Sequence, residues 1–329
     1  MLSLTSPLTS LGSLPVLNLV SARLRSAVSG SMEGGGPDRQ GLPGEQYSDP
    51  PGDPGWFGPG SVTWRVHADP SMMVGGIAAL LLQALHPPTM AGVTDHSNYK
   101  DDPLGRLART SSFVVGTTYG STEAAERLVK LVRAYHRRVV GTTPDGVPYD
   151  ARDPHLVTWV HATEVAMFLA AHQRFVPFPV RGEAADRYFH EMAIVAEKLG
   201  ATWVPRSRVA LATYFRDMQD ELSYSDQARE AVRFVTTPIR SRSNPMVGLA
   251  HQTLIQAAVG ILPPWGRELL GLRQPMVIDR AMVRPATHLI MNTLRFAGGT
   301  PPPIAEARRR CAAEPAVPVI APAASSPAA

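Results

Sequence analysis

Cysteine is nearly absent from the sequence: Cys311 is the single thiol among 329 residues. One cysteine cannot form an intrachain disulfide and cannot build a cysteine-based zinc site. The first thirty residues also lack the early basic segment and the compact apolar core of a cleaved secretory signal. Both absences favour a reducing compartment, and we expect a cytoplasmic protein.

The sequence also lacks an apolar run long enough to cross a membrane. The best candidate, residues 70–94, contains no Asp, Glu, Lys or Arg, but a Gly-Gly pair, His86 and a Pro-Pro pair interrupt it. Its uninterrupted part is therefore shorter than the roughly 20 residues that a span requires. A buried core helix is the favoured interpretation; membrane association is possible but is not predicted.

Composition divides the chain into one folded unit and two tails. Apolar residues make up 44% of the sequence, which is enough for a sizeable core. Residues 1–55 end in a Gly- and Pro-rich stretch and are predicted as a disordered arm, and residues 298–329 as a disordered Pro/Ala-rich tail. Residues 56–297 form the predicted domain. The formal charge of +4 comes from scattered basic residues without interleaved aromatics, which argues against a nucleic-acid partner.

Within this domain, helix signals outnumber strand signals. Asp-Pro precedes a periodic segment at residues 69–70, 102–103 and 153–154, and Asp followed by Pro suits the first turn of a helix. No segment shows sustained strand alternation, so the predicted fold is an all-α, single-domain helical bundle. The expected helices cover residues 70–86, 103–119, 122–140, 154–173, 183–199, 206–221, 225–235, 246–261 and 279–296.

The stretch from Asp102 to Gly141 contains the first candidate site. His136 lies on the apolar face of the second helix of this stretch, where a neutral imidazole suits an axial haem ligand. Arg106 and Arg109 neighbour each other one turn apart in the first helix, with Thr110 beside them, and paired guanidinium groups suit carboxylates or a developing anion. The alternatives are a hydrogen-bonded core histidine and two solvated arginines.

A second inward histidine, His161, lies in the helix predicted at 154–173. Glu164 follows one turn later, so a carboxylate could orient the imidazole or join it in a metal site. Di-iron bundles usually carry Glu-x-x-His on two helices. The sequence has one His-x-x-Glu in the reverse order and no Glu-x-x-His, which places a di-iron site well below haem.

Taken together, these motifs resemble the mpaB/rubber-oxygenase catalytic domain, a family that includes the latex-clearing proteins. The resemblance covers residues 56–297. It rests on Gln83-x-x-His86-Pro, Asp95-His96-Ser97, Asp102-Pro103-x-Gly105-Arg106-Leu-x-Arg109-Thr110, Tyr119-Gly120, His136-x-x-Val139-x-Gly141, Asp145-Gly146-x-x-Tyr149 and Trp159-Val160-His161-Ala162-Thr163.

The resemblance implies an all-α, haem b-dependent oxygenase that uses dioxygen on an apolar isoprenoid or lipid-like substrate. Oxidative cleavage of a carbon–carbon double bond is the reaction of the family's characterised members, and hydroxylation or dehydrogenation is equally compatible with these residues. The resemblance also implies that His136 is the axial ligand of the haem iron, with His161 as the alternative, and that Arg106, Arg109 and Thr110 form the distal group. Rubber-cleaving members carry Lys where this chain has Arg109, which changes the hydrogen-bond geometry. The competing hypotheses are a non-catalytic haem- or lipid-binding helical protein and a non-haem di-iron oxidase.

Overall fold

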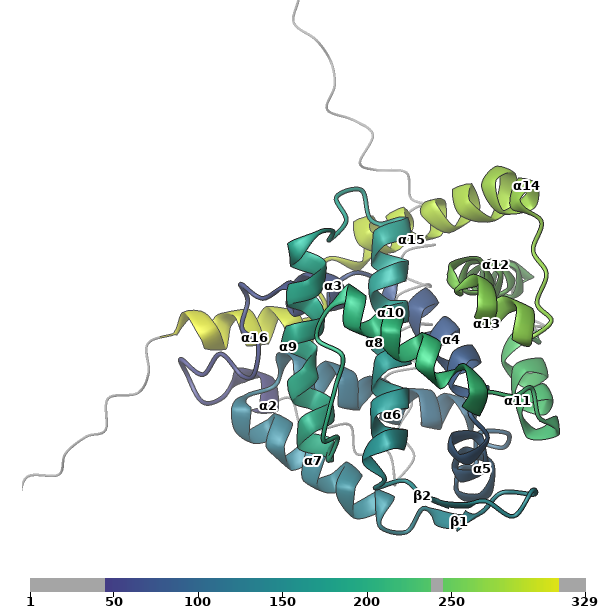
Figure 1. The fold of residues 1–329 in the computed structure, drawn as a ribbon. Coiled ribbons are helices and arrows are strands. Elements are labelled where there is room, and N and C mark those ends of the chain that lie inside the picture. The colour runs from purple at the N-terminus through teal and green to yellow at the C-terminus, as the bar shows by residue number, and fades with distance from the viewer. Residues whose placement is uncertain (1–44, 238–244, 314–329) are drawn as a thin grey trace, which may run out of the picture.

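The fold was analysed in a computed structural model, which describes residues 45–237 and 245–313 (Figure 1). The described chain is mostly helical, as the sequence predicts. The α-helices are α2 (Glu45–Ser48), α3 (Val62–His67), α4 (Met72–Gln83), α5 (Pro87–His96), α6 (Pro103–Tyr119), α7 (Thr122–His136), α8 (Pro154–Phe175), α9 (Glu183–Leu199), α10 (Arg208–Asp217), α11 (Asp226–Thr236), α12 (Pro245–Ile261), α13 (Pro264–Leu269), α14 (Met276–Ile278), α15 (Arg284–Gly298) and α16 (Pro302–Ala312).

Short irregular elements join these helices. A 3-10 turn, η1 (Met218–Glu221), continues α10, and a π-helical segment, η2 (Asp279–Val283), leads into α15. Strands β1 (Val140–Thr142) and β2 (Pro148–Asp150) pair antiparallel as a hairpin. Gly146 has a φ of 84°, a left-handed conformation that glycine adopts without strain, and it lies in the turn of this hairpin.

Capping by aspartate fixes two of the helix starts that the sequence predicts. The Asp102 side chain accepts a hydrogen bond from the Gly105 amide at the start of α6, and Asp153 accepts one from the His155 amide at the start of α8, both at 2.9 Å. The third Asp-Pro pair acts differently, because α4 begins two residues later, at Met72. The cap positions of α6 and α8 orient the two helices that carry most of the predicted site residues.

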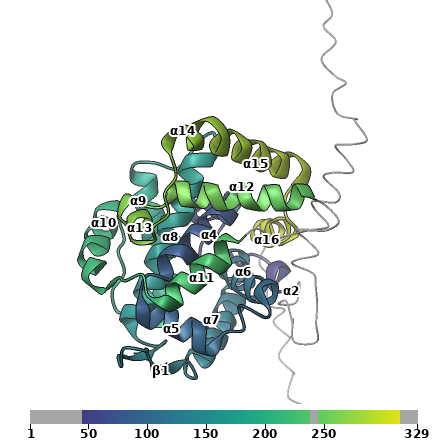
Figure 2. The ribbon, with the colours of Figure 1, turned by 90° about the vertical axis from the view of Figure 1, so that its right-hand side faces the viewer.

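Helix α8 is the centre of the bundle, and α3, α4, α5, α9, α12 and α15 all contact it. Its pairing with α4 is the most extensive helix contact in the described chain. Figure 2 shows α12 and α15 lying side by side across one end of the bundle. The principal core cluster includes Leu81 and Leu82 of α4 together with Trp159 and Phe175 of α8, all nearly inaccessible to solvent.

The close approach of α4 to α8 depends on Gly75. A Cβ atom there would lie 2.8 Å from the Met167 carbonyl oxygen and 2.9 Å from the Phe168 Cα, and backbone atoms of a packed helix cannot move aside cheaply. We expect Gly75→Ala to lower the free energy of unfolding by about 1–3 kcal/mol, measured by urea denaturation.

Gly76 provides the matched control for that substitution. It lies in the same helix, and a Cβ atom added there would have a Phe168 ring carbon, at 3.9 Å, as its nearest neighbour. Gly76→Ala should be neutral or stabilising by up to about 1 kcal/mol, because alanine favours helix over glycine. If both variants lost the same free energy of unfolding, the close contact between α4 and α8 at Gly75 would not explain the loss in Gly75→Ala.

Part of each predicted disordered tail is helical. Residues 298–329 are predicted as a disordered tail, but α16 lies within them and packs on α2 and α6, with Ile304 and Ala307 buried. Arg310 is also buried and donates hydrogen bonds to the carbonyls of Tyr47, Asp53 and Gly120. The predicted disordered arm 1–55 likewise contains α2. Residues 1–44 and 314–329 lie outside the described residues.

Two further corrections concern secondary structure. The helix predicted over 122–140 ends at His136, because the hairpin of β1 and β2 follows it. Helix α5 was not predicted; it begins at the Pro-Pro pair after His86, since proline is tolerated in the first helical turn. Among the described residues no single helix is long and apolar enough to span a membrane. Helices α4 and α5 are long and apolar enough when taken together, but they are bent by 106° at their junction.

Candidate functional site

The most strongly perturbed carboxylic acid in the core is Glu164 of α8. Desolvation raises the pKa of its carboxyl group to about 7. The side chain nevertheless keeps partial access and is only half-buried, and no hydrogen bond to it is found within the described residues. An unpaired carboxyl group that is desolvated in this way is a candidate for proton transfer.

His161 lies one helical turn before Glu164, with its side chain buried. Burial lowers the pKa of its imidazole to about 4, so the ring is neutral at physiological pH. Its Nε2 atom is buried and has no hydrogen-bond partner. An unsatisfied buried nitrogen is costly, which makes this ring a candidate for a ligand or a proton-transfer partner that is bound only in the working protein.

A buried polar chain from three other helices adjoins the Glu164 side of α8. The His67 imidazole lies 2.9 Å from Thr118 Oγ1 and 3.0 Å from the Tyr188 hydroxyl, and it meets the Phe168 ring edge to face. Burial lowers the pKa of His67 to about 3 and raises that of Tyr188 well above its usual value, with Glu164 as a second cause of the Tyr188 shift. Sequence reasoning missed this network, because His67 and Tyr188 lie in no motif.

His136 is the last residue of α7, on the same face as the buried Leu128 and Val129. It is half-buried, and burial lowers its pKa while the nearby Asp150 acts in the opposite direction. Its ring nitrogens make no hydrogen bond within the described chain and are not among the buried unpaired atoms. His136 therefore lies partly buried at the edge of the fold, and its ring nitrogens are accessible.

The three polar residues of α6 are less buried than a distal site in the core requires. Arg106 is half-buried and donates a hydrogen bond to the Ser97 hydroxyl, and burial lowers its pKa with the neighbouring Arg109 as a further cause. Arg109 is exposed and lies 3.4 Å from the carboxylate of Asp102, which caps the same helix. Thr110 is exposed as well.

The structure thus brings the predicted residues together in two groups rather than one. Arg106 and Arg109 are neighbours at the start of α6, and His161 and Glu164 are neighbours on α8. Across the described residues, no hydrogen bond or ion pair joins His136 to either group.

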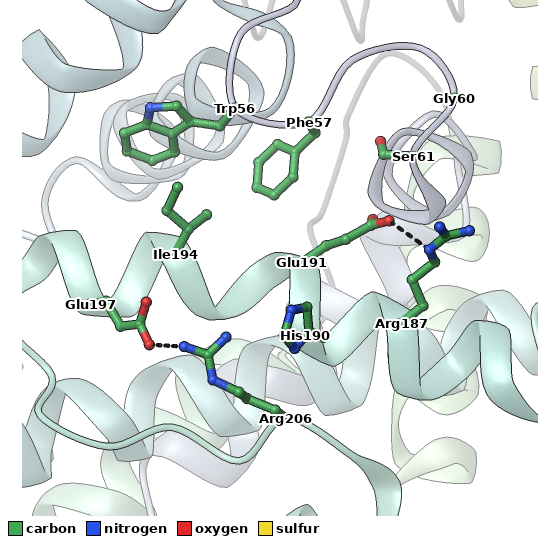
Figure 3. A pocket seen from close by; sticks show the side chains of 10 residues that line it. All are labelled: Trp56, Phe57, Gly60, Ser61, Arg187, His190, Glu191, Ile194, Glu197 and Arg206. Atoms are coloured by element: carbon green, nitrogen blue, oxygen red, sulfur yellow. Dashed lines mark hydrogen bonds and ion pairs between the residues drawn. The ribbon is translucent and has the colours of Figure 1, made fainter.

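Two surface pockets lie away from all of these residues. The larger, of about 480 Å³, lies between the loop before α3 and helix α9, and Figure 3 shows Trp56 and Phe57 facing Ile194 across it. Its charged side chains are already paired, Arg187 with Glu191 and Glu197 with Arg206. The smaller, of about 220 Å³, is an apolar groove between α8, α9 and α10. Neither offers the unpaired polar groups found in α8.

Comparison with known proteins adds a decisive observation. Residues 64–296 match the family model for the catalytic domain of the ER-bound oxygenase mpaB/B' and rubber oxygenase. The chain belongs to this family. The match begins in α3 and ends in α15, so it contains every residue assigned to the site from the sequence. No curated protein and no solved structure matches the chain.

Membership in the mpaB/rubber-oxygenase family indicates the class of reaction, oxygenation. The family is one of oxygenases that includes rubber oxygenase, and its name implies oxygenase activity. The α8 helix, with a neutral buried imidazole and a carboxyl group that titrates near pH 7, provides chemistry of the kind found in catalytic sites.

Proposed function

We propose that this protein is a haem b-dependent oxygenase that uses dioxygen on an apolar, isoprenoid or lipid-like substrate. The observation that carries the proposal is the family match over residues 64–296. The neutral imidazoles of His136 and His161 support it, because an iron ligand must offer a free nitrogen lone pair.

His136 fits the role of axial ligand better than His161. An iron ion inside a porphyrin needs an approachable nitrogen, and the His136 ring is half-buried with its nitrogens open. The Nε2 atom of His161 has no accessible surface, so the iron could reach it only after α8 or its neighbours move. When bound, the haem would supply the activation of dioxygen, and the protein would supply binding and orientation.

The residues of α6 fit different parts of such a site. Arg106 is the guanidinium closer to the interior, and its charge would favour a reacting oxygen atom that gains negative charge. Arg109 and Thr110 are exposed, so both would be free to reach carboxylate groups of a bound haem, Arg109 after it leaves Asp102. Glu164 would hold or release a proton near neutral pH.

The proposed reaction is oxidative cleavage of a carbon–carbon double bond. One dioxygen molecule and one alkene give two carbonyl groups, each product keeping one oxygen atom, so the balance needs no external electrons. The half-buried apolar residues Phe113 and Val114 of α6, together with Val160 of α8, are packed against the main core cluster and would line the path of an alkene chain.

The test compares an isoprenoid alkene with its saturated counterpart. Protein produced with ample haem supply should show a Soret band, and squalene should cause oxygen uptake with the formation of carbonyl products. Squalane has the same carbon skeleton without double bonds, so it should cause no uptake. A Soret band without uptake on any alkene would favour the non-catalytic binding protein, and iron without porphyrin would favour the di-iron oxidase.

A further inference from the structure

Three potential metal ligands from separate parts of the chain meet beside α8. They are His86, the residue that precedes α5, His155 in the first turn of α8, and Glu221 at the end of η1. One ligand atom from each residue lies within 4.8 Å of the other two. The His155 Nε2 is 2.7 Å from Glu221 Oε2, and the His86 Nε2 is 3.5 Å from the same oxygen.

His86 is held in a way that directs Nε2 into this cluster. Its side chain is 2% exposed, and its Nδ1 lies 3.0 Å from the Thr89 hydroxyl. When Nδ1 donates to Thr89, the lone pair is on Nε2. The only hydrogen-bond contact of that Nε2 within the described chain is the 3.5 Å approach to Glu221, which is too long for a good hydrogen bond.

A hydrogen bond between His155 and Glu221 would satisfy the polar groups of those two residues but not the imidazole of His86. It would leave the Nε2 of His86, on a side chain that is 2% exposed, with only the 3.5 Å contact to Glu221, and a poorly paired buried nitrogen costs free energy in a folded protein. A cation between the three groups would satisfy the lone pairs of both imidazoles and the carboxylate together. The imidazole of His86, fixed by Thr89, has the arrangement usual for a metal ligand whose second nitrogen is oriented by a neighbouring oxygen.

We propose that His86, His155 and Glu221 bind one divalent transition-metal ion of the zinc or ferrous-iron class. Two imidazoles and one carboxylate are a donor set that these ions favour over magnesium or calcium. Ligand bonds of about 2.0–2.2 Å place donor atoms about 3.0–3.5 Å apart, so the contacts of 2.7 and 3.5 Å need only small shifts. The ligand nitrogens of His86 and His155, which lie within 4.8 Å of each other, would have to reach the same range when the ion binds. The side chains of His155 and Glu221 are 43% and 47% exposed, which gives the ion a route from solvent and leaves positions for water.

This site is separate from the proposed oxygenase site, and it does not rest on that proposal. None of its three ligands belongs to the residues assigned to haem. The ion would join the α4–α5 corner to the start of α8 and to η1, which are far apart in the sequence.

The experiment measures zinc binding to the full chain with its affinity tag removed and after treatment with a chelator. Isothermal titration should give one zinc ion per chain, and magnesium should not compete. His155→Ala and Glu221→Gln replace exposed ligands, so both variants should fold, as circular dichroism would check, and should bind zinc at least about 100-fold more weakly. Thr89→Val should weaken binding by about tenfold.

His190→Ala is the matched control, because His190 is an exposed histidine on α9. It should bind zinc as the unmodified chain does. The proposal is overturned if the unmodified chain binds no zinc, or if Glu221→Gln and His155→Ala bind it as tightly as the control. The haem content of each variant is measured in parallel, and its expected constancy separates this site from the oxygenase site.

Discussion

Replacing His136 with alanine should give a folded protein that retains less than about a tenth of the haem carried by the unmodified protein. An axial ligand supplies the direct bond to the iron, and loss even of a residue that only supports a ligand costs about 10–100-fold in affinity. His136 is half-buried at the end of α7 and makes no hydrogen bond within the described chain, so its removal should leave the helix intact. The ratio of Soret absorbance to protein absorbance measures the effect.

Two controls separate ligation from a general loss of packing. Free imidazole added to His136→Ala should partly restore the Soret band, because it can occupy the place of the lost ring. His161→Ala should keep its haem if His136 is the ligand. The opposite pattern, in which His161→Ala loses haem and His136→Ala keeps it, would transfer the ligand role to His161 and require that α8 move to expose its Nε2.

Helix boundaries were predictable from the sequence where residues next to the boundary determine it. Helices α6 and α9 have the boundaries predicted from the sequence, since Asp102-Pro103 starts the first and Gly200, with a φ of 119°, ends the second. The hairpin after His136 was missed because its strands are only three residues long, too short for alternation to show. Helix α16 was missed because an Ala-, Arg- and Pro-rich composition resembles a disordered tail, whereas contacts with α2 and α6 keep it ordered.

Sequence patterns could predict only those features of the site that depend on one helix. The apolar spacing correctly predicted that the His161 side chain is buried, because α8 is buried along most of its length. The exposure of Arg109 and Thr110 could not be read from α6 alone, because the face that a helix buries depends on which neighbours cover it. The network of His67, Thr118 and Tyr188 joins residues up to 121 positions apart, so no local pattern could have indicated it.

Replacing Glu164 with glutamine should change how the stability of the protein depends on pH. The carboxyl group binds its proton more tightly in the folded state, where its pKa is about 7, than in the unfolded state, where the ordinary value is 4.5. As pH rises from 4.5 to 7 the unfolded state loses this proton first, so the stability of the native protein falls through that window. A pKa shift of this size lowers the free energy of unfolding above pH 7 by at most about 3 kcal/mol.

The measurement is the free energy of unfolding in urea at about pH 5 and about pH 8 for both proteins. Relative to the unmodified protein, Glu164→Gln should gain up to about 3 kcal/mol between these two conditions, because its amide does not ionise. Glu268→Gln is the matched control: Glu268 is exposed on α13, and its carboxylate is hydrated in both states. A pH-independent difference for Glu164→Gln would mean that the carboxyl group is hydrated in the folded protein.

The same substitution tests whether this cost to stability serves the reaction. A protein that keeps an unpaired carboxyl group in its core loses stability at neutral pH, and such a group persists where activity needs it. If Glu164 exchanges a proton during turnover, the pH dependence of oxygen uptake should contain a step near pH 7 that Glu164→Gln removes together with most of the activity. If Glu164→Gln is more stable above neutral pH and equally active at every pH, the carboxyl group has no part in catalysis, and the proton chemistry belongs elsewhere in the site.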